Sequence, residues 1–257
     1  MNESLWKLRP LESCLFSDRE GSAHICDLLD LLAISHKYCA SAIEARTLEK
    51  LVVLTRADKV GYLDADICVR ILETAFLVDS NELARPARAS LLWLIRPHMS
   101  NPLASTTDCD LVKLLAFGKG ANDREIMGAA YYAIMCNGRE WWSSDDNGVD
   151  QADRCRLTEG MMRCAVEWHD IQTRWAADGF GCHLQCVQKC NVLDASLRLQ
   201  AQRGIAWYDV VGKINATLSA NSSLASNSSC EYRIAETVAD VLHRVRSEFY
   251  EYFTERI

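Results

Sequence analysis

The sequence contains no apolar run of the roughly 18 residues that a helix needs to span a bilayer. The segment from Met1 to Pro10 is mixed polar, with Trp6, Lys7 and Arg9, and has no apolar core typical of a secretory signal. We therefore expect a protein without a membrane span that stays inside the cell, in the cytoplasm or the nucleus.

Several common functional motifs are also absent. The chain has no Gly-x-Gly-x-x-Gly fingerprint, no phosphate-binding loop and no Gly-x-Ser-x-Gly nucleophile elbow. It has no basic excess either, because 28 Lys and Arg face 35 Asp and Glu, for a net charge of −7. A general nucleic-acid binder usually needs a basic face, so this charge balance argues against nucleic acid as a partner.

Cysteine, by contrast, is abundant, with 12 residues scattered along the chain. Most of them fall within apolar stripes of predicted helices, where a thiol behaves as a small apolar side chain. In an intracellular chain long enough to bury a core, this pattern favours reduced thiols over a disulfide framework.

The clearest structural pattern is a helical hairpin from Asp66 to Met99. Each of its halves repeats apolar residues at intervals of three and four, which places them on one helix face. The turn is predicted at Asp79, Ser80 and Asn81, and Pro97 is predicted to end the second helix. The first stripe is Ile67, Cys68, Ile71, Leu72, Ala75 and Phe76, and the second is Ala84, Ala87, Leu91, Leu94 and Ile95.

The same pattern of amphipathic helices joined by short turns continues through the whole chain. It predicts an all-α fold of antiparallel helical hairpins. We expect an N-terminal helical half over 1–140, an acidic loop over 141–156 and a C-terminal helical half over 157–257, unless these form one continuous domain. A stack of such hairpins resembles, in architecture, the armadillo/HEAT class, whose paired helices recur at roughly 40 residues. No signature residues recur between the pairs, so an irregular helical bundle is the alternative.

Two features are candidate partner-binding surfaces. Arg85, Arg88 and Arg96 give the second hairpin helix a basic side, which suits an acidic partner or a plain solvated face. Trp141 and Trp142 are adjacent and so point in different directions, which leaves one of them available to anchor a partner.

Two other clusters carry residue types that bind metals. Cys182 and Cys186, joined by His169 or Cys164, offer thiolate and imidazole ligands for a zinc ion. Asp145, Asp146 and Asp150 form a carboxylate cluster that resembles the aspartate-rich motif of isoprenoid synthases, interrupted here by Asn147 and Gly148. A helix seam filled with thiols and a solvated acidic linker are the plain interpretations of the two clusters.

The absence of a site motif and the many amphipathic helices favour a non-enzymatic scaffold or adaptor that binds a protein partner, with no cofactor. One alternative is an all-α metal-dependent enzyme that uses the Asp-rich loop. The other is a zinc-stabilised subunit of an RNA-containing complex.

Overall fold

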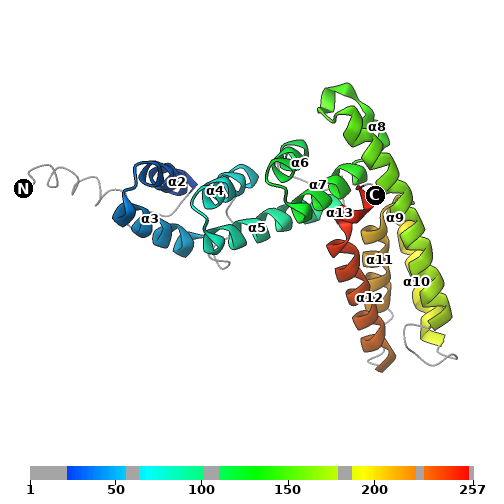
Figure 1. Cartoon of the computed structure of the whole chain (residues 1–257). Helices are drawn as coiled ribbons and strands as arrows, with labels where there is room; N and C mark the ends of the chain where they lie inside the picture. The colour runs from blue at the N-terminus through cyan, green and yellow to red at the C-terminus, as the bar shows by residue number, and fades with distance from the viewer. Residues whose placement is uncertain (1–21, 56–63, 101–109, 179–186, 224–228, 255–257) are drawn as a thin grey trace, which may run out of the picture. The chain divides into compact units, whose positions relative to one another are not determined.

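The computed structural model describes residues 22–55, 64–100, 110–178, 187–223 and 229–254 (Figure 1). Within these ranges the chain forms twelve α-helices and one 3-10 helix and no strand, which confirms the all-α fold class. No helix of the described ranges is long and apolar enough to cross a membrane. The chain divides into two compact units, Met1–Leu94 and Ile95–Ile257, and the predicted acidic loop over 141–156 lies inside the second unit.

The first unit contains α2 (Ser22–Lys37), α3 (Ser41–Leu54), α4 (Ala65–Leu77) and most of α5 (Asn81–Ser100). α2 packs against both α3 and α4. An exposed ion pair between Arg70 and Asp30, 2.7 Å between Nη2 and Oδ1, also links α2 with α4. The buried apolar side chains of this unit include Leu28, Leu32, Leu51, Ile71, Leu72, Leu83 and Leu91.

Pro97 does not end its helix as the sequence had suggested, because α5 continues to Ser100. A proline removes one backbone hydrogen bond and crowds the carbonyl four residues earlier. That cost disfavours a helix without forbidding it, and the flanking residues keep their helical conformation here. The predicted hairpin of residues 66–99 is otherwise present as α4 and α5.

Three helical hairpins share one turn geometry. The turns between α2 and α3, between α4 and α5, and between α6 and α7 each contain a residue of positive φ, at Cys39, Asp79 and Asn122. The N–H of the following residue donates to the carbonyl five positions back in all three turns, with N···O distances of 2.8, 2.8 and 2.9 Å. This is the Schellman end of a helix, and in each hairpin it leads directly into the next helix.

The second unit contains the remaining helices. They are α6 (Leu111–Gly120), α7 (Arg124–Cys136), α8 (Arg139–Ser143), the 3-10 helix η4 (Asp145–Asn147), α9 (Gln151–Asp178), α10 (Val187–Gln202), α11 (Val210–Ser223), α12 (Ser229–Ser247) and α13 (Phe249–Tyr252). α6 pairs with α7, while α11 lies against α9, α10 and α12 (Figure 1). α7 is the central element, because every side chain from Ile126 to Cys136 is buried.

The short helix α13 packs closely against α7 and α9. Phe249 stacks on Tyr132, with ring centroids 4.3 Å apart, and Phe253 stacks on Tyr131 at 5.2 Å. Phe253 has no exposed surface. The C-terminal aromatic residues are therefore part of the core of the second unit.

Glycine makes this close approach possible at two points. A Cβ atom at Gly128 of α7 would overlap the backbone of α13 at Phe249 and Tyr250. A Cβ atom at Gly160 of α9 would overlap the ring of Phe253. The absence of a Cβ atom at Gly128 and Gly160 thus leaves the space in which α13 and Phe253 pack into the core.

Candidate partner-binding surfaces

One face of α5 is buried and the opposite face is exposed. Leu83, Ala87, Leu91 and Ile95 recur every four residues with no exposed surface, and they hold the helix to the core. Arg85 and Ala89 lie on the other side of the helix, Arg88 lies at the edge between the two faces, and all three are exposed.

Trp93 belongs to this exposed face, and 55% of its surface is accessible. It follows Arg85 and Ala89 at four-residue steps, so the three form one stripe along the helix. Arg88, one turn beyond Arg85, borders this stripe. We call Arg85, Arg88, Ala89 and Trp93 the α5 face. The third predicted arginine, Arg96, lies in the same helix, but its side chain is outside the described residues.

Trp93 was not predicted from the sequence, because it stands inside the apolar run 91–95 and resembles a core residue. The signal was nevertheless present. Trp93 lies outside the apolar stripe of this helix, and its spacing from Arg85 places both residues on the same helix face.

The two adjacent tryptophans of α8 have different environments. The side chain of Trp142 is buried, with 3% exposure, and its indole Nε1 has no hydrogen-bond partner. Trp141 is half-buried and lines a surface groove. Of the two predicted anchors, Trp141 is thus the accessible one and Trp142 belongs to the core.

The groove beside Trp141 has a volume of about 610 Å³. One wall is the start of α6, where Asp110 accepts hydrogen bonds from the N–H groups of Val112 and Lys113, both at 3.1 Å. The opposite wall is formed by α8 and η4. The lining residues are Asp110, Leu111, Val112, Lys113, Ala116, Asn137, Trp141, Asp146, Asn147 and Gly148.

The acidic segment near this groove begins a helix rather than forming a loop throughout. Asp150 accepts a hydrogen bond from the backbone N–H of Asp153 at 2.7 Å, so it caps the first turn of α9. This hydrogen bond is the main cause that lowers the pKa of Asp150. Because of the cap, α9 starts at Gln151, six residues before the predicted second half.

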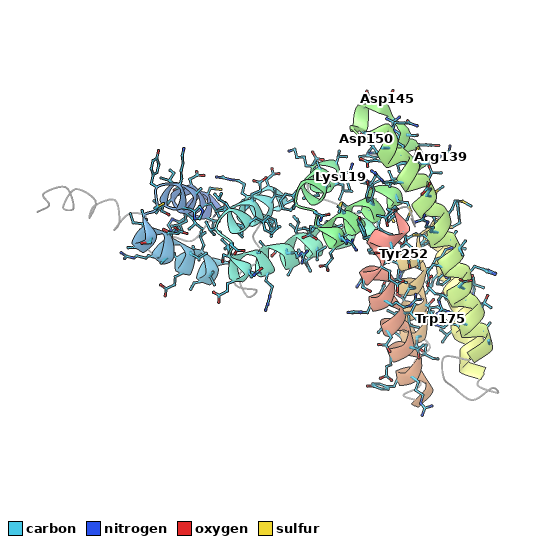
Figure 2. All side chains as sticks on the ribbon, viewed as in Figure 1. Lys119, Arg139, Asp145, Asp150, Trp175 and Tyr252 are labelled. Carbon is cyan, nitrogen blue, oxygen red and sulfur yellow. The ribbon has the colours of Figure 1, made fainter. Side chains whose placement is uncertain are left out.

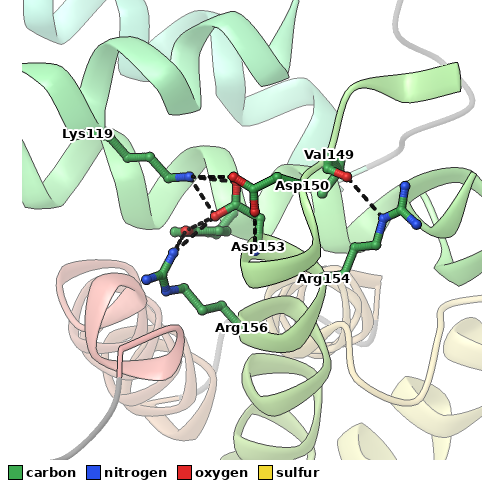
Figure 3. A network of polar contacts seen from close by, with 7 residues as sticks. Lys119, Val149, Asp150, Asp153, Arg154 and Arg156 are labelled. Carbon is green, nitrogen blue, oxygen red and sulfur yellow. Dashed lines mark hydrogen bonds and ion pairs between the residues drawn. The ribbon is translucent and has the colours of Figure 1, made fainter. Parts of the chain in front are cut away.

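The carboxylates of this segment have separate partners. Asp145 pairs with Arg154 at 2.7 Å. Asp150, which Figure 2 labels together with Asp145, approaches Lys119 at 3.8 Å (Figure 3). Asp146 is exposed and lines the groove. Across the part of the chain that the structure describes, no three His, Cys, Asp or Glu side chains lie together in a way that could hold a metal ion.

Asp153, just beyond the predicted cluster, is the centre of a partly buried polar network (Figure 3). Lys119 donates to both of its carboxylate oxygens at 2.6 Å, and the Tyr131 hydroxyl donates to Oδ1 at 2.6 Å. Arg156 adds a third donor at 3.2 Å. Burial, and next the hydrogen bond to Asp153, raise the pKa of Tyr131. The network joins α6, α7 and α9 and acts as structural support.

The proposed zinc ligands are only partly described. Cys182 and Cys186 lie outside the described residues. Cys164 and His169 are both on α9, but Cys164 is fully buried and His169 is exposed. Five residues along a helix correspond to a rotation of about 140°, so these two side chains leave α9 in different directions. Burial also raises the pKa of the Cys164 thiol, which disfavours the thiolate that a metal needs.

A second buried carboxylate, Asp209, lies at the start of α11. It accepts hydrogen bonds from the Tyr132 hydroxyl at 2.9 Å and from the N–H of Gly212 at 2.7 Å. The Tyr132 hydroxyl in turn accepts from the N–H of Val211 at 2.8 Å. Burial raises the pKa of Asp209 to about 6, although these hydrogen bonds and nearby Lys213 lower it. The cluster connects α7 to α11 within the core.

This raised pKa predicts how stability changes with pH. The pKa of the Asp209 carboxyl is about 6 in the folded protein and about 4 in the unfolded chain. Between these two pH values the carboxyl is mostly protonated in the folded state and mostly ionised in the unfolded state. Relative to Asp209→Asn, the wild-type protein should therefore become more stable as the pH falls from 7 to 4, by at most about 1.4 kcal/mol per pH unit. Urea unfolding of both proteins across this range measures the difference. If the free energy of unfolding changed equally with pH in both proteins, the raised pKa of Asp209 would be contradicted.

Comparison with protein-family models, with curated proteins and with solved structures found no match.

Proposed function

We propose that this protein is a non-enzymatic helical scaffold that binds an acidic segment of a partner protein on the α5 face. The observation that carries the proposal is Trp93, a large aromatic side chain that is 55% exposed in line with Arg85. Tryptophan and arginine are the residues most enriched among those that dominate protein–protein binding energy. We further propose that the scaffold works inside the cell, where its buried thiols Cys136 and Cys164 stay reduced.

The hairpin turns support a repeat architecture for the scaffold. Cys39, Asp79 and Asn122 are roughly 40 residues apart, the spacing of armadillo/HEAT-like hairpins. Buried leucines recur before these turns, and buried Leu or Ile residues recur after them. They are Leu32, Leu72 and Leu115 before, and Leu51, Leu91 and Ile134 after. We therefore interpret α2–α3, α4–α5 and α6–α7 as three copies of one hairpin whose sequences have diverged.

The chemistry of the α5 face favours an acidic partner. Arg85 and Arg88 carry positive charges on an exposed helix surface, whereas the chain as a whole has a net charge of −7. An arginine side chain can pair with a carboxylate in a bidentate manner. Trp93 adds apolar surface beside these charges, and covering it would strengthen the complex.

The proposal is tested by affinity capture from cell extract with the full-length wild-type protein and two variants. Trp93→Ala should lose the partner, since it removes the aromatic anchor of the α5 face. Trp207→Ala is the matched control, because Trp207 is 52% exposed but lies in the second unit. Captured proteins are compared by quantitative mass spectrometry.

The expected result is a protein with an acidic segment that is captured by the wild type and by Trp207→Ala but is depleted at least tenfold with Trp93→Ala. Arg85→Glu combined with Arg88→Glu should deplete the same protein. If every captured protein were recovered equally with all variants, the α5 face would not be the binding surface.

A further inference from the structure

We propose that the groove beside Trp141 binds a Lys or Arg side chain from an extended segment of a partner protein. This site is separate from the α5 face and selects the opposite charge. Its expected ligand is a basic peptide, with the cationic group over the Trp141 ring and near the Asp146 carboxylate.

The composition of the groove supports a cationic ligand. It offers an accessible aromatic side chain, Trp141, and the apolar surfaces of Val112 and Ala116. An aromatic face attracts a cation through its quadrupole, and tryptophan does so most strongly. The aliphatic stem of a lysine or arginine would cover the apolar part of the lining.

The charges of the groove favour the same ligand. Lys113 is the cationic residue of the lining, and its Nζ lies 3.9 Å from Oδ2 of Asp110. The negative charge of Asp110 therefore offsets the positive charge of Lys113. Asp146 is exposed, and within the described ranges of the chain no Lys, Arg or His forms an ion pair with its carboxylate. Asp145 is neighbouring but already pairs with Arg154. The remaining negative charge in the lining is therefore that of Asp146.

The wall that carries Asp146 is fixed before any ligand binds. Asn147 donates to the carbonyl of Trp141 at 2.8 Å, and Arg154 donates to the carbonyls of Val149 and Ser144 at 3.0 and 3.1 Å. The Asn147 bond holds η4 against α8, and the Arg154 bonds tie the residues on either side of η4 to α9, so binding would require little ordering of the protein. Because the groove keeps its shape without a ligand, a single cationic side chain can bind there specifically even though the contact is weak.

The test uses the full chain labelled with 5-fluorotryptophan and followed by ¹⁹F NMR. Trp141→Phe identifies the Trp141 signal, because that signal disappears from the spectrum. The probes are the peptide acetyl-Gly-Ser-Arg-Arg-Ser-Gly-amide and its counterpart with Glu in place of both Arg, each titrated at constant ionic strength. The measured quantities are the shift of the Trp141 signal and the dissociation constant it yields.

The proposal predicts a saturable shift of the Trp141 signal with the Arg peptide and none with the Glu peptide. Asp146→Asn should weaken Arg-peptide binding about three- to fivefold, the range expected for an exposed ion pair. Asp170→Asn, at another exposed aspartate of the second unit, should leave the binding unchanged.

Three results would overturn the proposal. They are the absence of a Trp141 shift with the Arg peptide, equal shifts with both peptides, and equal affinities for the wild type and Asp146→Asn. The signals of the other tryptophans report whether each variant keeps its fold, so a folding defect cannot imitate loss of binding. Failure here would leave the α5 face untouched, because the two tests use different residues and ligands of opposite charge.

Discussion

Gly128→Ala should lower the free energy of unfolding of the second unit by about 3 kcal/mol or more. The added methyl group would overlap the backbone of α13 at Phe249 and Tyr250. A backbone cannot move aside as a flexible side chain does, so the expected cost is at the upper end of the range for overpacked cores. Urea unfolding followed by tryptophan fluorescence measures the effect, since Trp141, Trp142, Trp168, Trp175 and Trp207 all belong to this unit.

Gly120→Ala is the matched control for this substitution. Gly120 lies in the last turn of α6, and a Cβ atom there would meet no atom within 4 Å. Alanine is the better helix former, so this variant should be more stable by about 0.5–1 kcal/mol. Equal effects of the two substitutions would show that α13 does not approach α7 as described.

Phe253→Ala should destabilise the second unit by about 3–5 kcal/mol. Phe253 is fully buried, stacks on Tyr131 and fills the space above Gly160. Removal of a buried phenylalanine ring loses its apolar contacts and leaves a cavity. Tyr232→Ala is the control, since Tyr232 of α12 is 72% exposed and its loss should change stability by less than about 0.5 kcal/mol.

A double-mutant cycle tests the contact between Gly160 and Phe253 directly. Gly160→Ala alone should be strongly destabilising, because the new methyl group would overlap the Phe253 ring. In the Phe253→Ala background the same substitution should cost little, since the ring is gone. Additive effects of the two substitutions would mean that the residues do not touch.

The helices could be predicted from the sequence because their signals are local. The apolar stripes of α4 and α5 repeat over three or four residues and could be found without knowledge of the tertiary structure. The course of α5 through Pro97 was one exception, and the start of α9 at Gln151, within the predicted acidic loop, was another. At Pro97 a local rule gave the wrong end, since proline weakens a helix without always ending it.

The common geometry of the three hairpin turns was harder to recognise in the sequence. The positive-φ position of the turn is occupied by Cys39, Asp79 and Asn122, three different residue types with one backbone conformation. The turns share a backbone angle, which no single residue type marks, and the buried leucine that precedes each turn (Leu32, Leu72 and Leu115) is one of many apolar residues in its helix.

The candidate sites were predictable in part. The basic side of α5 was visible in Arg85 and Arg88, whereas Trp93 was hidden within an apolar run. The groove beside Trp141 needed knowledge of the tertiary structure, since its walls come from segments 36 residues apart, at Asp110 and Asp146. The close contacts of α13 depend on Gly128 and Gly160, whose role appears only when the helices are packed together.

The central claim is that the α5 face binds an acidic partner, and the affinity of the purified partner tests it most directly. Isothermal titration calorimetry would give the dissociation constant for the wild type, Trp93→Ala and Trp207→Ala. We expect Trp93→Ala to weaken binding by about 30-fold, equivalent to about 2 kcal/mol, and Trp207→Ala to match the wild type. Equal dissociation constants for all three proteins would contradict the account.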